Sequence, residues 1–343
     1  MQPKVRRLYL PKIKLVGLII FVALAIILVA KTVFWGQKFM RQTGLTPTTV
    51  FHLVFDTGAP LASLDQRTNI LILGIGGGSH TGPDLTDTMM VMSLNRTKST
   101  MAFISIPRDI WSDTLKDKVN SAYHYGQEKK KGGGLVLAKA ISEDVVGIPI
   151  QYSAVVDFSG FTKIIDLVGG VTVNVPKAFS DPDFPIDGKE DDPCGGDPLF
   201  RCRYEAVHFD AGPQLMNGEQ ALKYVRSRHA EGDEGSDFAR SRRQQEVLVD
   251  LKAKLTSVWT WFPPSRAFAL LRAIDDATDS DMNIGEFLTI SKSIAQTSQN
   301  QIKKIAIDDL LISPPESWYG NRYVLLPKDS FDTIHAYIIQ QLQ

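Results

Sequence analysis

The sequence predicts an α/β protein, built as a three-layer αβα sandwich around a mixed central sheet and preceded by one N-terminal transmembrane helix. Three short apolar runs, at 70–75, 89–94 and 100–106, have the length and composition of strands. Their apolar residues are continuous rather than alternating, so both faces of the sheet should be buried under helices. Helical and strand patterns then alternate from 134 to 175, which is typical of helices layered over a sheet.

The remaining elements follow from local signals. Asn217 and Gln220 have the spacing of a capping box, which predicts a short helix to about Tyr224. A longer helix is expected over 237–258, because leucines and valine recur there at helical spacing. The other expected elements are helices at 134–146 and 161–168, strands at 154–158 and 171–175, and, in the tail 265–343, two or three helices and a strand near 322–326.

The first 35 residues predict a membrane anchor. Residues 15–30 are sixteen uncharged, almost wholly apolar positions. Residues 32–35 extend this apolar run if the Lys31 side chain snorkels to the membrane surface. A helix of this length, at about 1.5 Å per residue, would cross about 30 Å of hydrocarbon. The preceding residues are basic without acids, which favours a cytoplasmic N-terminus. No small-x-small site follows the run, which disfavours the alternative of a cleaved signal peptide.

These signals divide the chain into four parts. We expect a cytoplasmic tail at 1–14, a transmembrane anchor at 15–35, a juxtamembrane stalk at 36–64 and an extracytoplasmic domain at 65–343. The protein would then lie at the cell membrane as a single-pass protein.

The charge balance limits the class of partner. Lysine and arginine number 38, as do aspartate and glutamate, so the formal net charge is zero. A nucleic-acid binder needs a basic footprint across a whole face, so no nucleic-acid partner is expected. Any basic site must be local.

The two cysteines, Cys194 and Cys202, lie eight residues apart in a segment rich in Asp, Pro and Gly. A disulfide between them would fit an oxidising compartment. A metal pair is the alternative, disfavoured because no second cysteine pair and no histidine at finger-like spacing accompany them.

A dense group of arginines is the most informative feature. Five occur within eighteen residues: Arg226, Arg228, Arg240, Arg242 and Arg243. Guanidinium groups match phosphate oxygens in bidentate fashion, so an anionic partner is indicated. The alternative that the residues leave open is a solvated helix face paired with neighbouring acids.

Helical geometry divides this group. Arg240, Arg243, Gln244 and Val247 share one face of the predicted helix, and Val247 directs that face inward. Arg242 points away and is left out of the site. Arg226 and Arg228 lie on one side if the chain is extended there.

A second group of polar residues flanks two of the strands. Asp84 and Asp87, three apart before the strand at 89–94, could hold a divalent cation such as Mg²⁺ or Mn²⁺. Arg108 follows the strand at 100–106, at a strand end where α/β sheets commonly build sites. The alternative is solvated turn acids and a loop arginine. The glycine run at 74–78 matches neither phosphate-binding pattern and favours a simple turn.

Taken in order, these pieces resemble the LytR-CpsA-Psr family. The matching segments are NILILGIG, LTDTMMVMSLN, ISIPRD, KVNSAYHYG, GVTVNV, NGEQALKYVRSR and DFARSRRQQ, which form a motif core over 69–248. The resemblance implies an αβα sandwich with an apolar tunnel for a polyprenyl chain, and arginines at its mouth that bind pyrophosphate beside Mg²⁺.

The same resemblance implies roles for individual residues. Asp87 would bind the metal, and Arg108, Arg226, Arg228 and Arg240 the pyrophosphate. Gln244 would belong to that cluster, with Arg243 as a supporting member. The expected catalytic residues are Arg108, Asp87, Arg226 and Arg228.

One position departs from the family pattern. Many members have a metal-binding aspartate two residues after the first strand's glycine, where this chain has Gly76. Asp84 could supply the missing carboxylate, or Asp87 and phosphate alone could hold the metal.

The implied activity is phosphoryl transfer. A glycopolymer would pass from a polyprenyl-pyrophosphate carrier to peptidoglycan or another wall acceptor, with Mg²⁺ and arginines stabilising the developing charge. The alternatives are hydrolysis of the pyrophosphate in the same site, and a non-enzymatic lipid-carrier binding or regulatory module.

Overall fold

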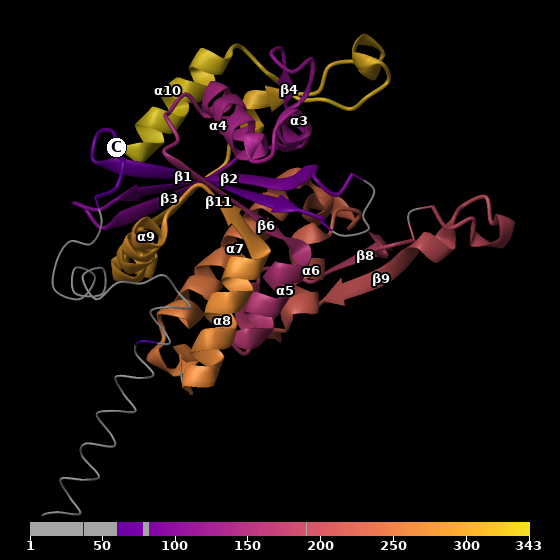
Figure 1. The fold of residues 1–343 in the computed structure, drawn as a ribbon. Coiled ribbons are helices and arrows are strands. Elements are labelled where there is room, and N and C mark those ends of the chain that lie inside the picture. Colours follow the sequence, from indigo (N-terminus) through magenta and orange to yellow (C-terminus); the bar gives the residue numbers. More distant parts are fainter. Residues whose placement is uncertain (1–36, 38–59, 78–81, 190, 262) are drawn as a thin grey trace, which may run out of the picture. The chain divides into compact units, whose positions relative to one another are not determined.

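The computed structural model describes residues 37, 60–77, 82–189, 191–261 and 263–343 (Figure 1). The predicted tail and anchor, and almost all of the stalk, lie outside these ranges. Within the described ranges, no helix has the length and hydropathy needed to cross a bilayer.

The described residues fall into two units, one that contains 283–289 and one of 61–282 with 290–343, within the ranges given above. In the first, Asn283 and Glu286 cap the start of helix α9 (Ile284–Gln296) by bonding to each other's backbone N–H groups, at 3.0 and 2.8 Å. The architecture described below is that of the second unit.

A six-stranded mixed sheet forms the centre of this unit. Its order is β11-β6-β1-β2-β3-β12. β1 pairs antiparallel with β2 and parallel with β6, β2 pairs antiparallel with β3, β12 joins β3 in parallel, and β11 joins β6 antiparallel. The prediction of a mixed sheet is therefore confirmed. The strands are β1 (Arg67–Ile75), β2 (Thr86–Asn95), β3 (Thr100–Ser105), β6 (Tyr152–Asp157), β11 (Thr278–Ser280) and β12 (Ile302–Ile305).

Helices cover both faces of the sheet (Figure 1). On one face, Leu71 and Ile104 pack in one core with residues of α3 (Ala122–Lys129), α4 (Gly133–Val146) and α10 (Phe331–Leu342). On the other, Ile70 and Phe103 pack with Val249 of α7 (Asp237–Thr256). Successive residues of one strand thus face opposite layers, which is why the strands read as continuous apolar runs.

A second core lies beside the sheet. It includes Ile165 of α5 (Phe158–Leu167), Val173 of β7 (Val171–Val175), Tyr224 of α6 (Gly218–Arg226) and Val247 of α7. β7 pairs antiparallel with β10 (Gly212–Met216). The capping box of α6 is confirmed: Asn217 Oδ1 accepts from the N–H of Gln220 at 2.9 Å, and Gln220 Oε1 from the N–H of Asn217 at 3.1 Å.

One long hairpin was not predicted. β8 (Phe179–Pro185) and β9 (Tyr204–Phe209) pair antiparallel and, with the loop between them, form what we call the β8–β9 arm (residues 179–209; Figure 1). The arm contains the whole of segment 181–204, which is rich in Asp and Pro and to which the sequence assigned no role. Polar residues and prolines in β8 hide the strand pattern.

The tail contains three helices, α8 (Pro264–Ala277), α9 and α10, at the upper end of the predicted number. The predicted strand near 322–326 is β14 (Leu326–Pro327), which pairs with β13 (Leu311–Ile312). The other short elements are β4 (Trp111–Ser112), β5 (Asp117–Lys118), η1 (Val119–Ser121), η2 (Cys194–Gly196), η3 (Arg201–Arg203), η4 (Gly232–Gly235), η5 (Val258–Trp261), η6 (Gln299–Gln301), η7 (Asp308–Leu310) and η8 (Glu316–Tyr319).

Candidate functional site

The site begins where β2 starts and β3 ends. The two strands are antiparallel with Met90 opposite Ser105, so Asp87 and Arg108 come to the same edge of the sheet. Nη1 of Arg108 donates to Oδ1 of Asp87, and both side chains are partly exposed. The structure therefore brings together two residues that the sequence predicts for the site.

Asp109 connects Arg108 to a second cation. Its Oδ2 lies 3.5 Å from Nε of Arg108, and its Oδ1 accepts from Nζ of Lys118 at 2.6 Å. Burial raises the pKa of Asp109. The hydrogen bond from Lys118 and the charges of Arg108, Lys118 and Arg228 outweigh burial and hold the pKa below its usual range. Asp109 is therefore ionised at neutral pH, where it orients cations and is a poor proton acceptor.

Arg228 approaches this edge from another part of the chain. Its charge lowers the pKa of Asp109, which places it within electrostatic reach of that carboxylate. The buried carboxylate of Asp181, on β8, fixes the backbone here: Oδ2 accepts from the N–H groups of Arg228 and His229, at 2.8 and 3.2 Å. We call Asp87, Arg108, Asp109, Lys118 and Arg228 the edge cluster.

Arg226 is held by different partners. Its Nη1 donates to Oδ1 of Asp187 at 2.8 Å, and its guanidinium lies over the rings of Phe158 and Phe184, at 4.5 and 5.5 Å from their centroids. These contacts join Arg226 to the β8–β9 arm and to α5. Its predicted contact with pyrophosphate stays a prediction.

Arg243 is fully buried and bonded to its own chain. Nε donates to the carbonyl of Tyr224 at 2.9 Å, Nη2 to that of Ser227 at 2.6 Å, and Nη1 to the carbonyl and carboxylate of Glu234 at 2.9 and 3.1 Å. We call these four residues the Arg243 cradle. Every nitrogen of the guanidinium is occupied, so Arg243 supports the loop that carries Arg226 and Arg228 instead of reaching a ligand.

The other predicted residues of α7 lie as helical geometry requires. Arg240 is buried, as expected for the inward face, and Arg242 pairs with Glu234. Nε2 of Gln244 donates to Oγ1 of Thr88 at 2.9 Å, which ties α7 to the residue next to Asp87. Gln244 therefore lies beside the edge cluster.

The two predicted metal ligands have separate neighbours. Asp84 Oδ2 lies 3.9 Å from Nδ1 of His124, whereas Asp87 is paired with Arg108. Mg²⁺ is commonly held by one or two carboxylates together with substrate phosphates. Asp87 is a partly exposed carboxylate beside guanidinium groups that suit phosphate, so this donor set fits such an ion.

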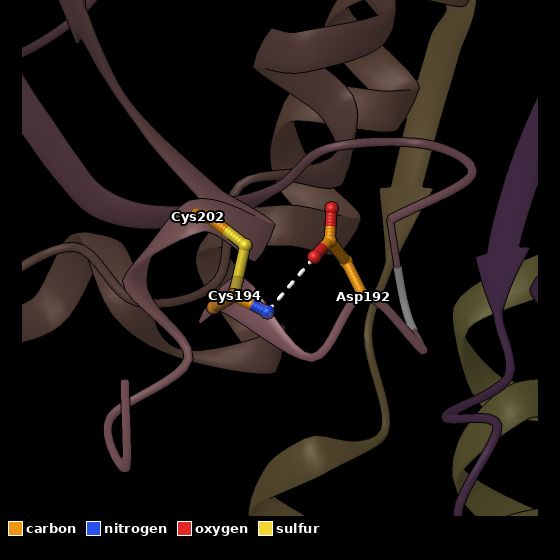
Figure 2. Close-up of side chains that lie close together, drawn as sticks. All are labelled: Asp192, Cys194 and Cys202. Atoms are coloured by element: carbon orange, nitrogen blue, oxygen red, sulfur yellow. Dashed lines mark hydrogen bonds between the residues drawn. A yellow bond between two sulfur atoms is a disulfide. The ribbon is translucent and has the colours of Figure 1, made fainter. Parts of the chain in front are cut away.

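The two cysteines form a disulfide, with Cα atoms 5.5 Å apart, as predicted (Figure 2). In the described part of the chain, one group of three candidate metal ligands was found, Asp192, Cys194 and Cys202. Both sulfurs are bonded to each other, and Oδ1 of Asp192 accepts from the N–H of Cys194 at 2.8 Å. These contacts argue against a metal pair here.

Sequence reasoning gave no role to Lys118 or Asp181, and named Glu234 only as one of the neighbouring acids that could pair with the arginines. Lys118 stands first in the KVNSAYHYG segment, whose order contributed to the resemblance without indicating a contact. Glu234 and Asp181 act through buried hydrogen bonds that only the folded chain brings together.

The fold of this chain is similar to solved structures of other proteins. The crystal structure of Bacillus subtilis TagV matches 82% of this chain and 98% of that one, with a TM-score of 0.57 and 24% identity. A structure of TagT bound to LI-WTA matches 82% of this chain and 94% of that one, with a TM-score of 0.56 and 21% identity. At these identities the likeness concerns the fold.

Two named proteins are also similar to this chain in amino-acid sequence. Regulatory protein MsrR of Staphylococcus aureus is 31% identical over 225 residues, 64% of this chain and 59% of the relative. The polyisoprenyl-teichoic acid–peptidoglycan teichoic acid transferase TagU of Oceanobacillus iheyensis is 26% identical over 283 residues, 81% of this chain and 77% of the relative. This chain thus spans about 59% of the length of MsrR. The LytR_cpsA_psr family model matches residues 47–337, most of the chain, and the protein belongs to that family.

Proposed function

We propose that this protein transfers a glycopolymer from a polyprenyl-pyrophosphate carrier to peptidoglycan or another cell-wall acceptor. The edge cluster is the observation that carries the proposal. It sets three cations, Arg108, Lys118 and Arg228, against two carboxylates, Asp87 and Asp109, an excess of one positive charge. The names of TagV and TagU, polyisoprenyl-teichoic acid–peptidoglycan teichoic acid transferases, support the reaction class.

The edge cluster suits a pyrophosphate because its cations are preorganised. Arg108 is held by Asp87 on one side and by Asp109 on the other, so its guanidinium does not have to be ordered when substrate arrives. Guanidinium groups match phosphate oxygens in pairs. Asp109, kept ionised, holds Arg108 and Lys118 in place through the reaction.

In the proposed reaction, a wall-sugar hydroxyl attacks the sugar-proximal phosphorus. A new P–O bond forms to the acceptor oxygen, whose O–H proton passes to water. The P–O bond to the bridging oxygen breaks, and polyprenyl phosphate leaves with that oxygen. Arg108 and Arg228 stabilise negative charge as it grows on the bridging and leaving oxygens. Asp87, with Asp84 as a possible second carboxylate, would hold Mg²⁺ or Mn²⁺, which supplies further charge neutralisation at the phosphates.

The proposal includes a membrane location. Residues 15–35 would anchor the chain, with the N-terminus in the cytoplasm and the domain outside. A carrier with a polyprenyl chain stays in the bilayer, so an anchored domain would meet it there.

The test uses the full chain in mild detergent, a polyprenyl-pyrophosphate oligosaccharide and wall fragments, with and without Mg²⁺. Mass spectrometry follows released polyprenyl phosphate and labelled acceptor. The proposal requires both products, formed only with the metal. Polyprenyl phosphate without labelled acceptor would indicate hydrolysis, and bound carrier without either product would indicate a binding or regulatory module, as the name of MsrR suggests for that relative.

A further inference from the structure

Aromatic side chains gather next to the β4–β5 hairpin. The rings of Trp111 and Tyr319 meet edge to face, with centroids 4.8 Å apart and planes at 68°. Cζ of Arg322 lies 5.4 Å from the centroid of the Trp111 ring. Trp318 and Tyr323, on the same loop as Tyr319, are 73% and 44% exposed. We call these five residues the aromatic platform, and its loop projects near β4 in Figure 1.

Polar contacts hold the aromatic platform in place. Nη1 of Arg322 donates to Oδ1 of Asp117 at 2.8 Å, and its Nε to the carbonyl of Tyr319 at 3.2 Å. Asp117 Oδ2 also accepts from the hydroxyl of Tyr125 at 2.5 Å. A surface fixed in this way loses little conformational entropy when a ligand binds.

The aromatic platform is built on the same chain segments as the edge cluster. Trp111 lies opposite Lys118 in the β4–β5 pair, and Lys118 donates to Asp109. The N–H of Leu325 donates to the carbonyl of Asp109 at 2.9 Å, and the N–H of Trp111 to the carbonyl of Leu325 at 3.0 Å. The loop of Trp318 and Tyr323 is therefore bonded directly to the strand end that carries Arg108.

The chemistry of this surface suits a sugar ring. A pyranose presents a face of C–H groups, which packs against the negative face of an indole or phenol ring. Its hydroxyl groups at the rim need donors and acceptors, which Arg322 and Asp117 offer nearby.

The charges on this surface argue against an anionic bilayer as the occupant. Lys116 pairs with Asp113 and Arg322 with Asp117. With Glu316, three acids stand against two bases, a net charge of −1 that gives no attraction to an anionic leaflet. We propose that the aromatic platform binds the acceptor glycan, through uncharged pyranose rings, next to the edge cluster. This rests on the proposed transferase activity.

Binding can be tested without any chemistry. The full chain in mild detergent is titrated with a hexasaccharide of β-1,4-linked N-acetylglucosamine, with no carrier present, and the dissociation constant is measured by NMR. Trp318→Ala should raise this constant about fivefold or more, the size expected for one lost stacking contact. Trp318→Phe keeps a ring and should restore most of the affinity. Trp259→Ala is the matched control, because Trp259 is another exposed tryptophan, at 81%, on η5.

Two results would overturn the proposal: no binding of the hexasaccharide to the unmodified chain, or equal affinities for that chain and Trp318→Ala. The second measurement is tryptophan fluorescence of the full chain reconstituted in phosphatidylglycerol vesicles whose brominated lipids quench nearby tryptophans. If Trp318→Ala removes quenching that Trp259→Ala keeps, and hexasaccharide affinity is unchanged, the aromatic platform is a membrane contact and the proposal fails. If the hexasaccharide binds through Trp318 but the transfer assay gives no product, the proposed transferase activity fails and the glycan-binding surface stands.

Discussion

The edge cluster and the Arg243 cradle both pair arginine with carboxylates, but one arginine is partly exposed and the other is buried. In the edge cluster, Arg108 is partly exposed and is held by the carboxylates of Asp87 and Asp109. In the cradle, Arg243 is fully buried and bonds to three backbone carbonyls and to Glu234. An arginine held by side chains at a surface can still receive a ligand, whereas one saturated by backbone carbonyls stabilises a loop.

The largest effect should come from breaking the cradle. Arg243→Met keeps about the same side-chain volume but removes the buried donor to Oε2 of Glu234 and to the carbonyls of Tyr224 and Ser227. Losing one partner of a buried pair typically costs about 3–5 kcal/mol of unfolding free energy. Urea unfolding followed by circular dichroism measures this, with Arg272→Ala as the control because that side chain is 82% exposed on α8. Equal midpoints for Arg243→Met and the control would refute the structural role.

Next in size is the loss of Arg108. Arg108→Ala should lower kcat of the proposed transfer about 10²–10³-fold, as for removal of one preorganised donor to a developing anion. Its unfolding midpoint should stay near that of the unmodified chain, because the side chain is partly exposed. Turnover by mass spectrometry and urea unfolding are measured on the same preparation. Normal turnover would remove Arg108 from the mechanism, and a large loss of stability would make it resemble Arg243.

Asp109→Asn should have a smaller effect, on the free energy of unfolding and on its dependence on pH. The pKa of Asp109 is lowered in the fold, so its contribution to stability is present above the unfolded pKa of about 3.9 and is lost as pH falls through the lower folded value. The variant should lose about 2 kcal/mol at pH 7, typical of a hydrogen bond to a charged group. In urea unfolding, the difference should shrink steadily as pH falls below about 4, because the carboxyl becomes protonated first in the unfolded chain. A difference that is equally large at pH 7 and pH 3 would show that the ionised carboxylate is not the cause.

The smallest effect concerns a half-buried carboxyl on α7 that belongs to neither group. Burial and the charge of Glu246 raise the pKa of Asp250 to about 6, against the opposing charges of Lys304 and Lys254. A raised pKa costs stability above about pH 6 and nothing below about pH 4, where the carboxyl is neutral in both states. After discounting for solvent screening, Asp250→Asn should add about 1 kcal/mol at pH 8. Unfolding at pH 8 and pH 4 tests this, and equal gains at both would contradict it.

Much of the fold could be predicted because its signals are local. The apolar runs at 70–75 and 100–106 became β1 and β3, and the Asn217–Gln220 spacing became a capping box. The β8–β9 arm could not be predicted, because Asp181 and Pro182 interrupt its first strand and its pairing depends on residues between nineteen and thirty positions away.

The candidate site shows a similar limit. Helical phase predicted that Arg240 and Arg243 face inward, and both are buried. Helical phase cannot distinguish a guanidinium that binds a ligand from one that bonds to the protein's own backbone, because both lie on the inward face of the helix. Lys118 was missed for a related reason: its role depends on the β4–β5 hairpin bringing it back to Asp109.

Asp181 has a consequence for anyone who engineers this protein. Its carboxylate, at the base of the β8–β9 arm, anchors the backbone of Arg228, while Gly195 and Gly196 lie exposed at the far end of the arm. A fluorophore or an affinity tag inserted between those glycines would leave the anchor in place, since exposed loop tips tolerate insertions. The far end of the arm is therefore an attachment point for imaging or immobilisation, provided that the insertion leaves Asp181 and its neighbours unchanged.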